Sequence, residues 1–181
     1  LCLFPCALLP VSAIISRKGR PCHAQSPMPN PLLIIAHAPS ANTRALAEAA
    51  LEGATDPEAG AIPTRLLSPF DVTAPDLFAA DALLIGTTEN IGYMAGATKD
   101  MFDRCYNDWL GATEAKPVAV YIRAALDGTA TRRALESIIG AQKWRLVAAP
   151  LILHGDWSPT YSGEVRDLAM GMAAGLDAGI F

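Results

Sequence analysis

Short apolar runs alternate with longer amphipathic stretches along this chain from residue 31 onwards. The first run, Pro-Leu-Leu-Ile-Ile-Ala at residues 31–36, is almost continuously apolar, which is typical of a strand buried on both faces of a parallel sheet. Pro150 leaves the exact span of the last strand open, because proline cannot donate a hydrogen bond to a neighbouring strand. The residues predicted as strands are 31–36, 62–67, 80–86, 117–122 and 146–153.

Between these runs, apolar residues recur at the spacing of one helix face. Met101, Phe102, Cys105 and Trp109 form such a face, so Cys105 is predicted to pack in the core. Gly53 is predicted to end the first helix, since glycine is the usual residue just after a helix. The residues predicted as helices are 43–52, 98–110, 129–139 and 162–176.

This alternation of strand and helix, repeated about five times, predicts an α/β fold with a doubly wound parallel sheet. No internal repeat and no low-complexity linker interrupts it. Residues 28–181 therefore form one predicted domain.

The first 27 residues differ in composition from the rest of the chain. They contain Arg17, Lys18 and Arg20 and no acidic residue. The basic residues follow the apolar stretch, whereas a secretory signal places them before it. We interpret residues 1–27 as a translated upstream region or a misplaced start, with Met28 as the true start. A genuine targeting signal or anchor remains the alternative.

Composition and charge narrow the function classes. With 181 residues, 51% of them hydrophobic and 18% charged, the chain is long enough for one domain with a core of its own. A net charge of −4 argues against nucleic acid as the main partner. The apolar stretch before residue 16 is too short to span a membrane. Cys105 is the one cysteine after residue 27, which fits a reducing cytoplasm.

Several well-known site signatures are missing from the sequence. The cysteines near the start of the chain lack the paired spacing of a zinc site, and we expect no metal. The G-x-G-x-x-G, Walker and G-x-S-x-G motifs are absent. The first strand ends at Ala36-His37, without the acidic cluster of a phosphate receiver.

Small polar residues follow the first predicted strand. Ser40, Asn42 and Thr43 lie where a helix begins, and free N–H groups at a helix N-terminus suit a phosphate. In the alternative interpretation, Asn42 or Thr43 only caps the helix. His37, at the start of this loop, either bonds to the backbone or contacts a ligand.

Two further polar loops follow the third and fourth predicted strands. Residues 87–96 combine glycines with amide, aromatic and thioether side chains, which suit the wall of a flat heteroaromatic ring. Residues 123–129 contain Arg123 and an Asp127-Gly128 turn signal. In a sheet of order 2-1-3-4-5 the loops after strands one, three and four converge, which favours a ligand site there. The alternative is a set of ordinary surface loops.

The stretch DALLIGTTENIGYMAGATKDMFDR, from Asp81 to Arg104, makes the comparison with known families specific. It resembles the second flavin loop of the flavodoxin-like NAD(P)H-dependent FMN reductases and quinone reductases. The segment around Ser40 is similar to their phosphate loop. His37 and Thr88 depart from the family pattern, which usually has Ser or Thr at the first position and Pro at the second.

This resemblance implies a flavodoxin-like three-layer fold with five parallel strands of order 2-1-3-4-5 that holds FMN. Its phosphate would lie at Ser40, Asn42 and Thr43 and its ring against residues 87–94 and 123–128. The predicted cofactor-binding residues are Ser40, Asn42, Thr43, Thr87, Thr88, Glu89, Asn90, Gly92, Tyr93, Met94, Arg123 and Gly128.

The implied activity is an NAD(P)H-dependent oxidoreductase. FMN would take a hydride from NAD(P)H and pass electrons to a quinone-like or other small acceptor, so no protein residue is predicted to be catalytic. The resemblance also implies a homodimer or tetramer. After the fifth strand, His154 is a candidate contact with substrate or a partner subunit, and Trp157 could close over the flavin site of its own or a neighbouring subunit. A non-enzymatic electron carrier and a domain without cofactor remain as alternatives.

Overall fold

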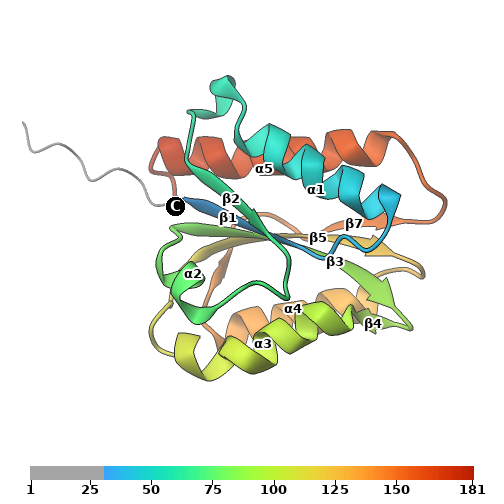
Figure 1. The fold of residues 1–181 in the computed structure, drawn as a ribbon, viewed down its shortest axis with the longest axis horizontal. Coiled ribbons are helices and arrows are strands. Elements are labelled where there is room, and N and C mark those ends of the chain that lie inside the picture. The colour runs from blue at the N-terminus through green and yellow to red at the C-terminus, as the bar shows by residue number, and fades with distance from the viewer. Residues whose placement is uncertain (1–30) are drawn as a thin grey trace, which may run out of the picture.

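A computed structural model describes residues 31–181, so the interpretation of residues 1–27 and of Met28 lies outside the described part of the chain. The ribbon is shown in Figure 1. Its elements are β1 (Leu32–Ala36), α1 (Ala41–Ala54), the 3₁₀ turn η1 (Pro57–Ala59), β2 (Thr64–Leu67), α2 (Ala74–Phe78), β3 (Ala82–Asn90), β4 (Tyr93–Met94), α3 (Gly96–Trp109), β5 (Pro117–Ala124), α4 (Thr129–Ala141), β6 (Arg145–Leu146), β7 (Leu151–His154) and α5 (Thr160–Asp177).

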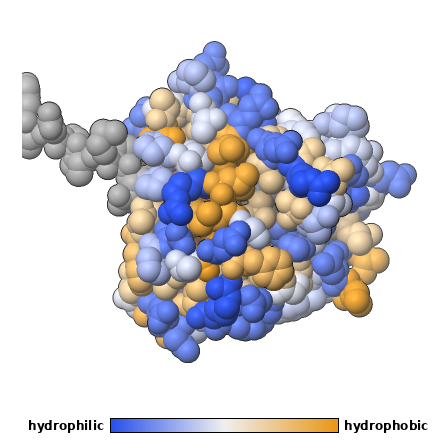
Figure 2. Space-filling view, in the orientation of Figure 1, coloured by the Kyte–Doolittle hydropathy of each residue, from blue (hydrophilic) through white to orange (hydrophobic). Residues whose placement is uncertain are grey.

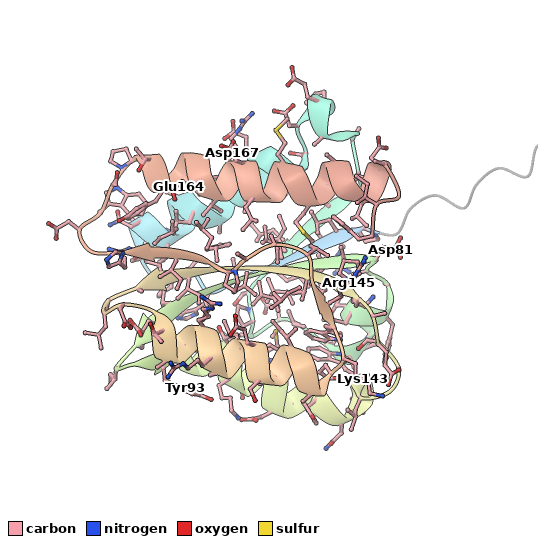
Figure 3. The ribbon with its side chains drawn as sticks, turned by 180° about the vertical axis from the view of Figure 1, so that it is seen from behind. Asp81, Tyr93, Lys143, Arg145, Glu164 and Asp167 are labelled. Carbon is pink, nitrogen blue, oxygen red and sulfur yellow. The ribbon has the colours of Figure 1, made fainter. Side chains whose placement is uncertain are left out.

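The elements form three layers. Helices α1 and α5 cover one face of the sheet, and α3 and α4 cover the other (Figure 1). The sheet between them is buried on both sides: every residue of β1 is buried, as are the first eight of β3. Figure 3 shows Glu164 and Asp167 on the outer side of α5, while Val165 and Ala169 of the same helix are fully buried. The predicted α/β fold with a parallel sheet is therefore confirmed.

The strand count differs from the expectation of five parallel strands in the order 2-1-3-4-5. Within residues 31–181 the sheet has seven strands, with β2-β1-β3-β5-β6 as its main path, β7 also on β5, and β4 antiparallel to β3. The predicted fifth strand is split into β6 and β7. While β5 advances from Val118 to Tyr121, its partner advances from Leu146 to Leu151, so two extra residues bulge out. Pro150 lies in this bulge, where its missing N–H breaks no ladder hydrogen bond.

The segment that the sequence predicted as a loop, residues 87–96, instead contains the end of β3 and the short strand β4. Strand β3 runs on to Asn90 and turns back at once, so that Asn90 pairs with Tyr93 and Glu89 with Met94. Both residues of this tight turn, Ile91 and Gly92, have positive φ, at 53° and 72°. That combination is typical of a two-residue hairpin turn.

Gly53 does not end α1, as the sequence suggested, but lies inside it, one residue before the helix ends. A Cβ atom built on Gly53 would come 2.1 Å from the carbonyl oxygen of Arg166 in α5. The glycine therefore serves the close packing of two helices. Helix α2 was not anticipated from the sequence.

The core on the α3 and α4 side contains an aromatic group. The rings of Phe102, Trp109 and Trp144 lie with centroids 5.8–6.4 Å apart. Cys105 is a free cysteine, 3% exposed in the same core, and burial raises the pKa of its thiol. Its predicted packing role is confirmed.

Candidate functional site

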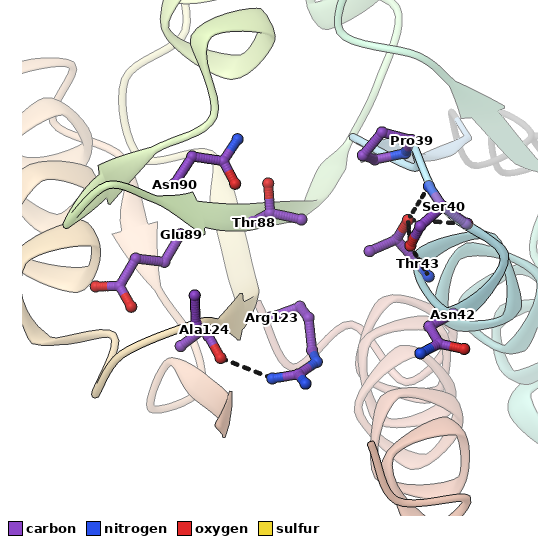
Figure 4. A pocket seen from close by; sticks show the side chains of 10 residues that line it. Pro39, Ser40, Asn42, Thr43, Thr88, Glu89, Asn90, Arg123 and Ala124 are labelled. Atoms are coloured by element: carbon purple, nitrogen blue, oxygen red, sulfur yellow. Dashed lines mark hydrogen bonds between the residues drawn. The ribbon is translucent and has the colours of Figure 1, made fainter. Parts of the chain in front are cut away.

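One cavity of about 320 Å³ opens at the carboxyl edge of the sheet, between the N-terminus of α1 and the ends of β3 and β5. We call it the edge pocket, and Figure 4 shows its side chains. Its volume lies at the lower end of the range for small-molecule sites. The lining residues are Pro39, Ser40, Asn42, Thr43, Thr88, Glu89, Asn90, Arg123, Ala124 and Ala125.

The first wall of the edge pocket is the start of α1. The amide of Ser40 donates to Thr43 Oγ1 at 2.9 Å, and the amide of Thr43 donates to Ser40 Oγ at 3.2 Å. Ser40 is thus the helix cap, with Thr43 as its reciprocal partner. Within residues 31–181 the amides of Ala41 and Asn42 make no hydrogen bond. They are the donors that this helix N-terminus offers to an anion.

The second wall comes from the end of β3. Thr88 is 8% exposed, and its Oγ1 has no hydrogen-bond partner within residues 31–181. Leaving a buried hydroxyl unpaired is costly, so a ligand oxygen or nitrogen at this point would satisfy it. The neighbouring Thr87 differs, because its Oγ1 lies 2.8 Å from Thr98 Oγ1 and does not line the pocket.

Glu89 holds the loop that follows β5. Although it is only 2% exposed, its carboxylate accepts the amides of Leu126 at 2.7 Å and of Gly128 at 3.3 Å. Two backbone donors compensate much of the cost of burying this charge. Gly128, whose φ is 74°, needs this conformation to begin α4. Glu89 therefore fixes the loop after β5, which forms the third wall of the pocket.

Arg123 occupies the floor between these walls (Figure 4). Its guanidinium donates to the carbonyls of Ala124 at 2.7 Å, Leu153 at 2.9 Å and Gly155 at 2.6 Å. It also lies 5.7 Å from the ring centroid of Tyr161, a cation–π contact. These contacts connect the ends of β5 and β7.

Seven of the twelve predicted cofactor-binding residues line the edge pocket: Ser40, Asn42, Thr43, Thr88, Glu89, Asn90 and Arg123. The other five do not line it: Thr87, Gly92, Tyr93, Met94 and Gly128. Three of these five belong to the β3–β4 hairpin: Gly92 lies in its turn, Tyr93 is 43% exposed and Met94 is buried. The binding roles of all twelve stay predictions.

Three lining residues are not among the twelve named individually as cofactor-binding: Pro39, Ala124 and Ala125. Pro39 lies in the loop already singled out. Ala124, the last residue of β5, and Ala125 both fall within residues 123–128, the range predicted to lie against the flavin ring.

The other candidate residues lie near the edge pocket but outside its lining. His37 meets Phe70 edge to face at 6.5 Å, and burial lowers the pKa of its imidazole. Trp157 packs on Tyr161 at 6.0 Å, and the Tyr161 hydroxyl donates to the His154 carbonyl at 2.5 Å. His37 and Trp157 thus pack against neighbouring aromatic rings, whereas His154 accepts through its backbone carbonyl and its side chain is exposed. Their contacts with a ligand or a neighbouring subunit stay predictions.

Lys99 and Arg104 form ion pairs within α3. Lys99 pairs with Asp103, and Arg104 pairs with Asp100 at 2.7 Å. Arg104 also donates to the carbonyls of Pro69 and Val72, at 2.8 and 3.0 Å. It therefore ties the segment before α2 to α3, as one expects of a fold-stabilising residue.

Residues 31–181 lack two further kinds of feature. No group of three or more His, Cys, Asp or Glu side chains is placed to hold a metal ion in this part of the chain. No helix there is both long and apolar enough to cross a membrane.

No protein-family model and no curated protein matches this sequence. Solved structures do match its fold. A flavodoxin from the domain Archaea superposes with a TM-score of 0.67 at 17% identity, covering 80% of this chain and 97% of that one. The chain has the flavodoxin-like fold.

Other structures share the flavodoxin-like fold. A flavodoxin, WrbA-like protein from Agrobacterium tumefaciens gives a TM-score of 0.65 at 18% identity, covering 83% of this chain and 98% of that one. The rubredoxin oxygen:oxidoreductase of Desulfovibrio gigas gives 0.68 at 12% identity, covering 83% of this chain and 37% of that longer chain. At these identities the likeness concerns the fold.

Proposed function

We propose that the edge pocket binds FMN and that the protein is an NAD(P)H-dependent oxidoreductase acting on a quinone-like or other small acceptor. One observation carries this proposal. A helix N-terminus with unused amides and a buried, unpartnered Thr88 hydroxyl face the same pocket at the carboxyl edge of a flavodoxin-like sheet. These groups suit a ligand that has an anionic end and polar atoms further along.

The residues present fit FMN. The amides of Ala41 and Asn42, with the side chain of Asn42, would hold the phosphate, and the Thr88 hydroxyl would bond a polar atom of the remaining flavin. The bound flavin would supply the redox chemistry, accepting a hydride from NAD(P)H and passing electrons on. The chain would contribute binding and orientation.

The fold neighbours support a redox role. Among them are a WrbA-like protein, the oxidoreductase of Desulfovibrio gigas and an oxidoreductase from Corynebacterium diphtheriae. Flavodoxins from an archaeon, Megasphaera elsdenii and Pseudomonas aeruginosa are also among them. These flavodoxins favour a second candidate function, a non-enzymatic electron carrier that uses the same pocket.

An absorption spectrum of the purified full chain tests the cofactor. We expect the two visible bands of a flavin, either directly or after incubation with excess FMN. Protein that is folded by circular dichroism, stays colourless and leaves FMN fluorescence unquenched would contradict the proposal and favour a domain without cofactor.

Steady-state assays with the loaded protein separate the enzyme from the carrier. We expect oxidation of NADH or NADPH when menadione or ferricyanide is present. Yellow protein that oxidises neither nucleotide would point to the electron carrier.

A further inference from the structure

Arg123 is the only positively charged side chain among the ten residues that line the edge pocket. The only other charged lining residue is Glu89, whose carboxylate already accepts two backbone amides. In Figure 4 Arg123 stands between Ala124 and Asn42, and the Glu89 carboxylate lies on the opposite side. The positive charge is therefore uncompensated in the half of the pocket next to α1.

The guanidinium is held in place without being neutralised. Its hydrogen bonds go to three carbonyl oxygens, which carry no net charge, and the Tyr161 ring adds a cation–π contact. Within residues 31–181 no carboxylate forms an ion pair with Arg123. The carbonyls occupy three of its five N–H donors and leave Nε–H and one Nη2–H. A charge fixed in advance costs little reorganisation when an anion arrives.

The start of α1 adds to this positive potential. The positive end of the dipole of α1 lies at its N-terminus, where the amides of Ala41 and Asn42 make no hydrogen bond within residues 31–181, and this end faces the same half of the pocket. Helix amides alone bind a phosphate by hydrogen bonds. A fixed guanidinium adds a full positive charge, which attracts the two negative charges of a phosphate monoester. This half of the pocket therefore suits a phosphate monoester on an otherwise uncharged ligand.

We propose that Arg123 is the residue by which this site selects flavin that carries a 5′-phosphate, FMN, over riboflavin. The inference rests on the proposed function, because it assumes that the pocket takes a flavin. It assigns to Arg123 a specificity role in addition to its contacts with the ends of β5 and β7.

Titration of the full chain, freed of flavin, with FMN and with riboflavin tests this role. The readout is quenching of flavin fluorescence at low and at high salt. We expect Arg123→Gln to weaken FMN binding by about 10- to 100-fold while the Kd of riboflavin changes by less than about threefold. Added salt should weaken FMN binding to the unmodified protein more than to Arg123→Gln. Salt screens the attraction between the Arg123 guanidinium and the phosphate, which the variant no longer has.

Two variants serve as controls. Arg133→Gln removes the same charge from an exposed position of α4 outside the edge pocket, and should leave both affinities unchanged. Arg123→Lys loses the planar fork of donors but keeps the positive charge. Because the proposed selection depends on the charge, this variant should retain most of the preference for FMN. Circular dichroism and a thermal melt establish whether each variant folds. If Arg123→Gln does not fold, the affinities of Arg123→Lys for FMN and riboflavin decide the question.

Three outcomes are distinct. Equal weakening of FMN and riboflavin in Arg123→Gln would overturn the inference, because it would show that Arg123 only supports the backbone. Unchanged affinities in Arg123→Gln would overturn it too. So would an Arg123→Lys variant that loses the preference for FMN over riboflavin as fully as a variant without the charge. If the unmodified protein binds neither flavin, the proposed function itself fails, and the inference fails with it.

Discussion

Thr88 carries a buried polar group that lowers stability as long as nothing bonds to it. Its hydroxyl is buried against the edge pocket with no partner within residues 31–181. A valine has nearly the same shape and would avoid the cost of burying that hydroxyl. A threonine at this position is what the proposed flavin site would require, since a bound flavin atom would bond to its hydroxyl.

We expect Thr88→Val to change stability and affinity in opposite directions. The free energy of unfolding of the flavin-free protein should rise by up to about 1 kcal/mol, because the unpaired hydroxyl is gone. FMN should bind about 3- to 10-fold more weakly, since it loses one hydrogen bond. Urea denaturation and fluorescence titration measure the two effects. A loss of stability with unchanged affinity would show that the hydroxyl is structural.

His37 should make stability depend on pH. Burial lowers the pKa of its imidazole below the ordinary value of 6.5. As the pH falls through 6.5, the unfolded chain takes up this proton before the folded protein does. The free energy of unfolding should therefore decrease below that pH and level off beneath the folded-state pKa.

Denaturation curves of the unmodified protein and of His37→Gln across this pH range test the effect. The variant should lose the part of the pH dependence that His37 contributes. An imidazole NMR titration that gave His37 a midpoint at or above 6.5 would contradict the prediction.

At the scale of elements, the packing of α1 on α5 depends on one missing side chain. Gly53 leaves room for the carbonyl of Arg166, and the Arg166 side chain reaches back to Asp56 at 2.5 Å. Alanine normally stabilises a helix interior relative to glycine. Here the methyl group would overlap a backbone oxygen that cannot rotate away, so the packing cost exceeds the propensity gain.

Gly53→Ala should accordingly lower the free energy of unfolding by about 1–3 kcal/mol, because the two helices must separate. The matched control is Gly171→Ala in α5, where nothing lies within 4 Å of the added methyl group. It should raise stability by about 0.5–1 kcal/mol. Thermal or urea unfolding of both variants gives the comparison, and equal effects of the same sign would refute the packing argument.

Two features that the sequence pattern did not predict have identifiable physical causes. The β3–β4 hairpin turns at Ile91-Gly92, whereas the usual signal for this turn is Asn-Gly or Asp-Gly. A β-branched residue rarely adopts positive φ, so the pattern predicted a loop. Ile91 is also fully exposed, and Figure 2 shows hydrophobic surface at this hairpin tip. The role of Gly53 was hidden because it depends on α5, which is distant in sequence.

At the scale of the whole molecule, the layered sheet was predictable because buried parallel strands have a continuous apolar pattern. The meeting of Ser40, Thr88 and Arg123 at one edge was also predictable, since parallel strands end on the same side. Contacts across the sheet, such as Glu89 with the amides of Leu126 and Gly128, were not, because no local spacing encodes them.

Binding of FMN should stabilise the entire domain. A ligand that binds only the folded state at about 100 times its Kd adds about 2.7 kcal/mol to the free energy of unfolding. For a domain of this size that corresponds to a rise in Tm of about 5–10 °C. Differential scanning fluorimetry of the flavin-free chain measures it, with adenosine monophosphate at the same concentration as a control that lacks the flavin. An equal shift with both nucleotides would mean that only the phosphate is recognised.

The break between β6 and β7 has a consequence for how copies of this protein meet in concentrated solution. An unbroken outer strand offers a row of free N–H and C=O groups on which a strand from another copy can continue the sheet. Here that border is a two-residue strand, a bulge with Pro150, and a four-residue strand. Neither piece is long enough to template a foreign strand, and the proline removes a donor between them. The interruption therefore protects the molecule against edge-to-edge aggregation along this border.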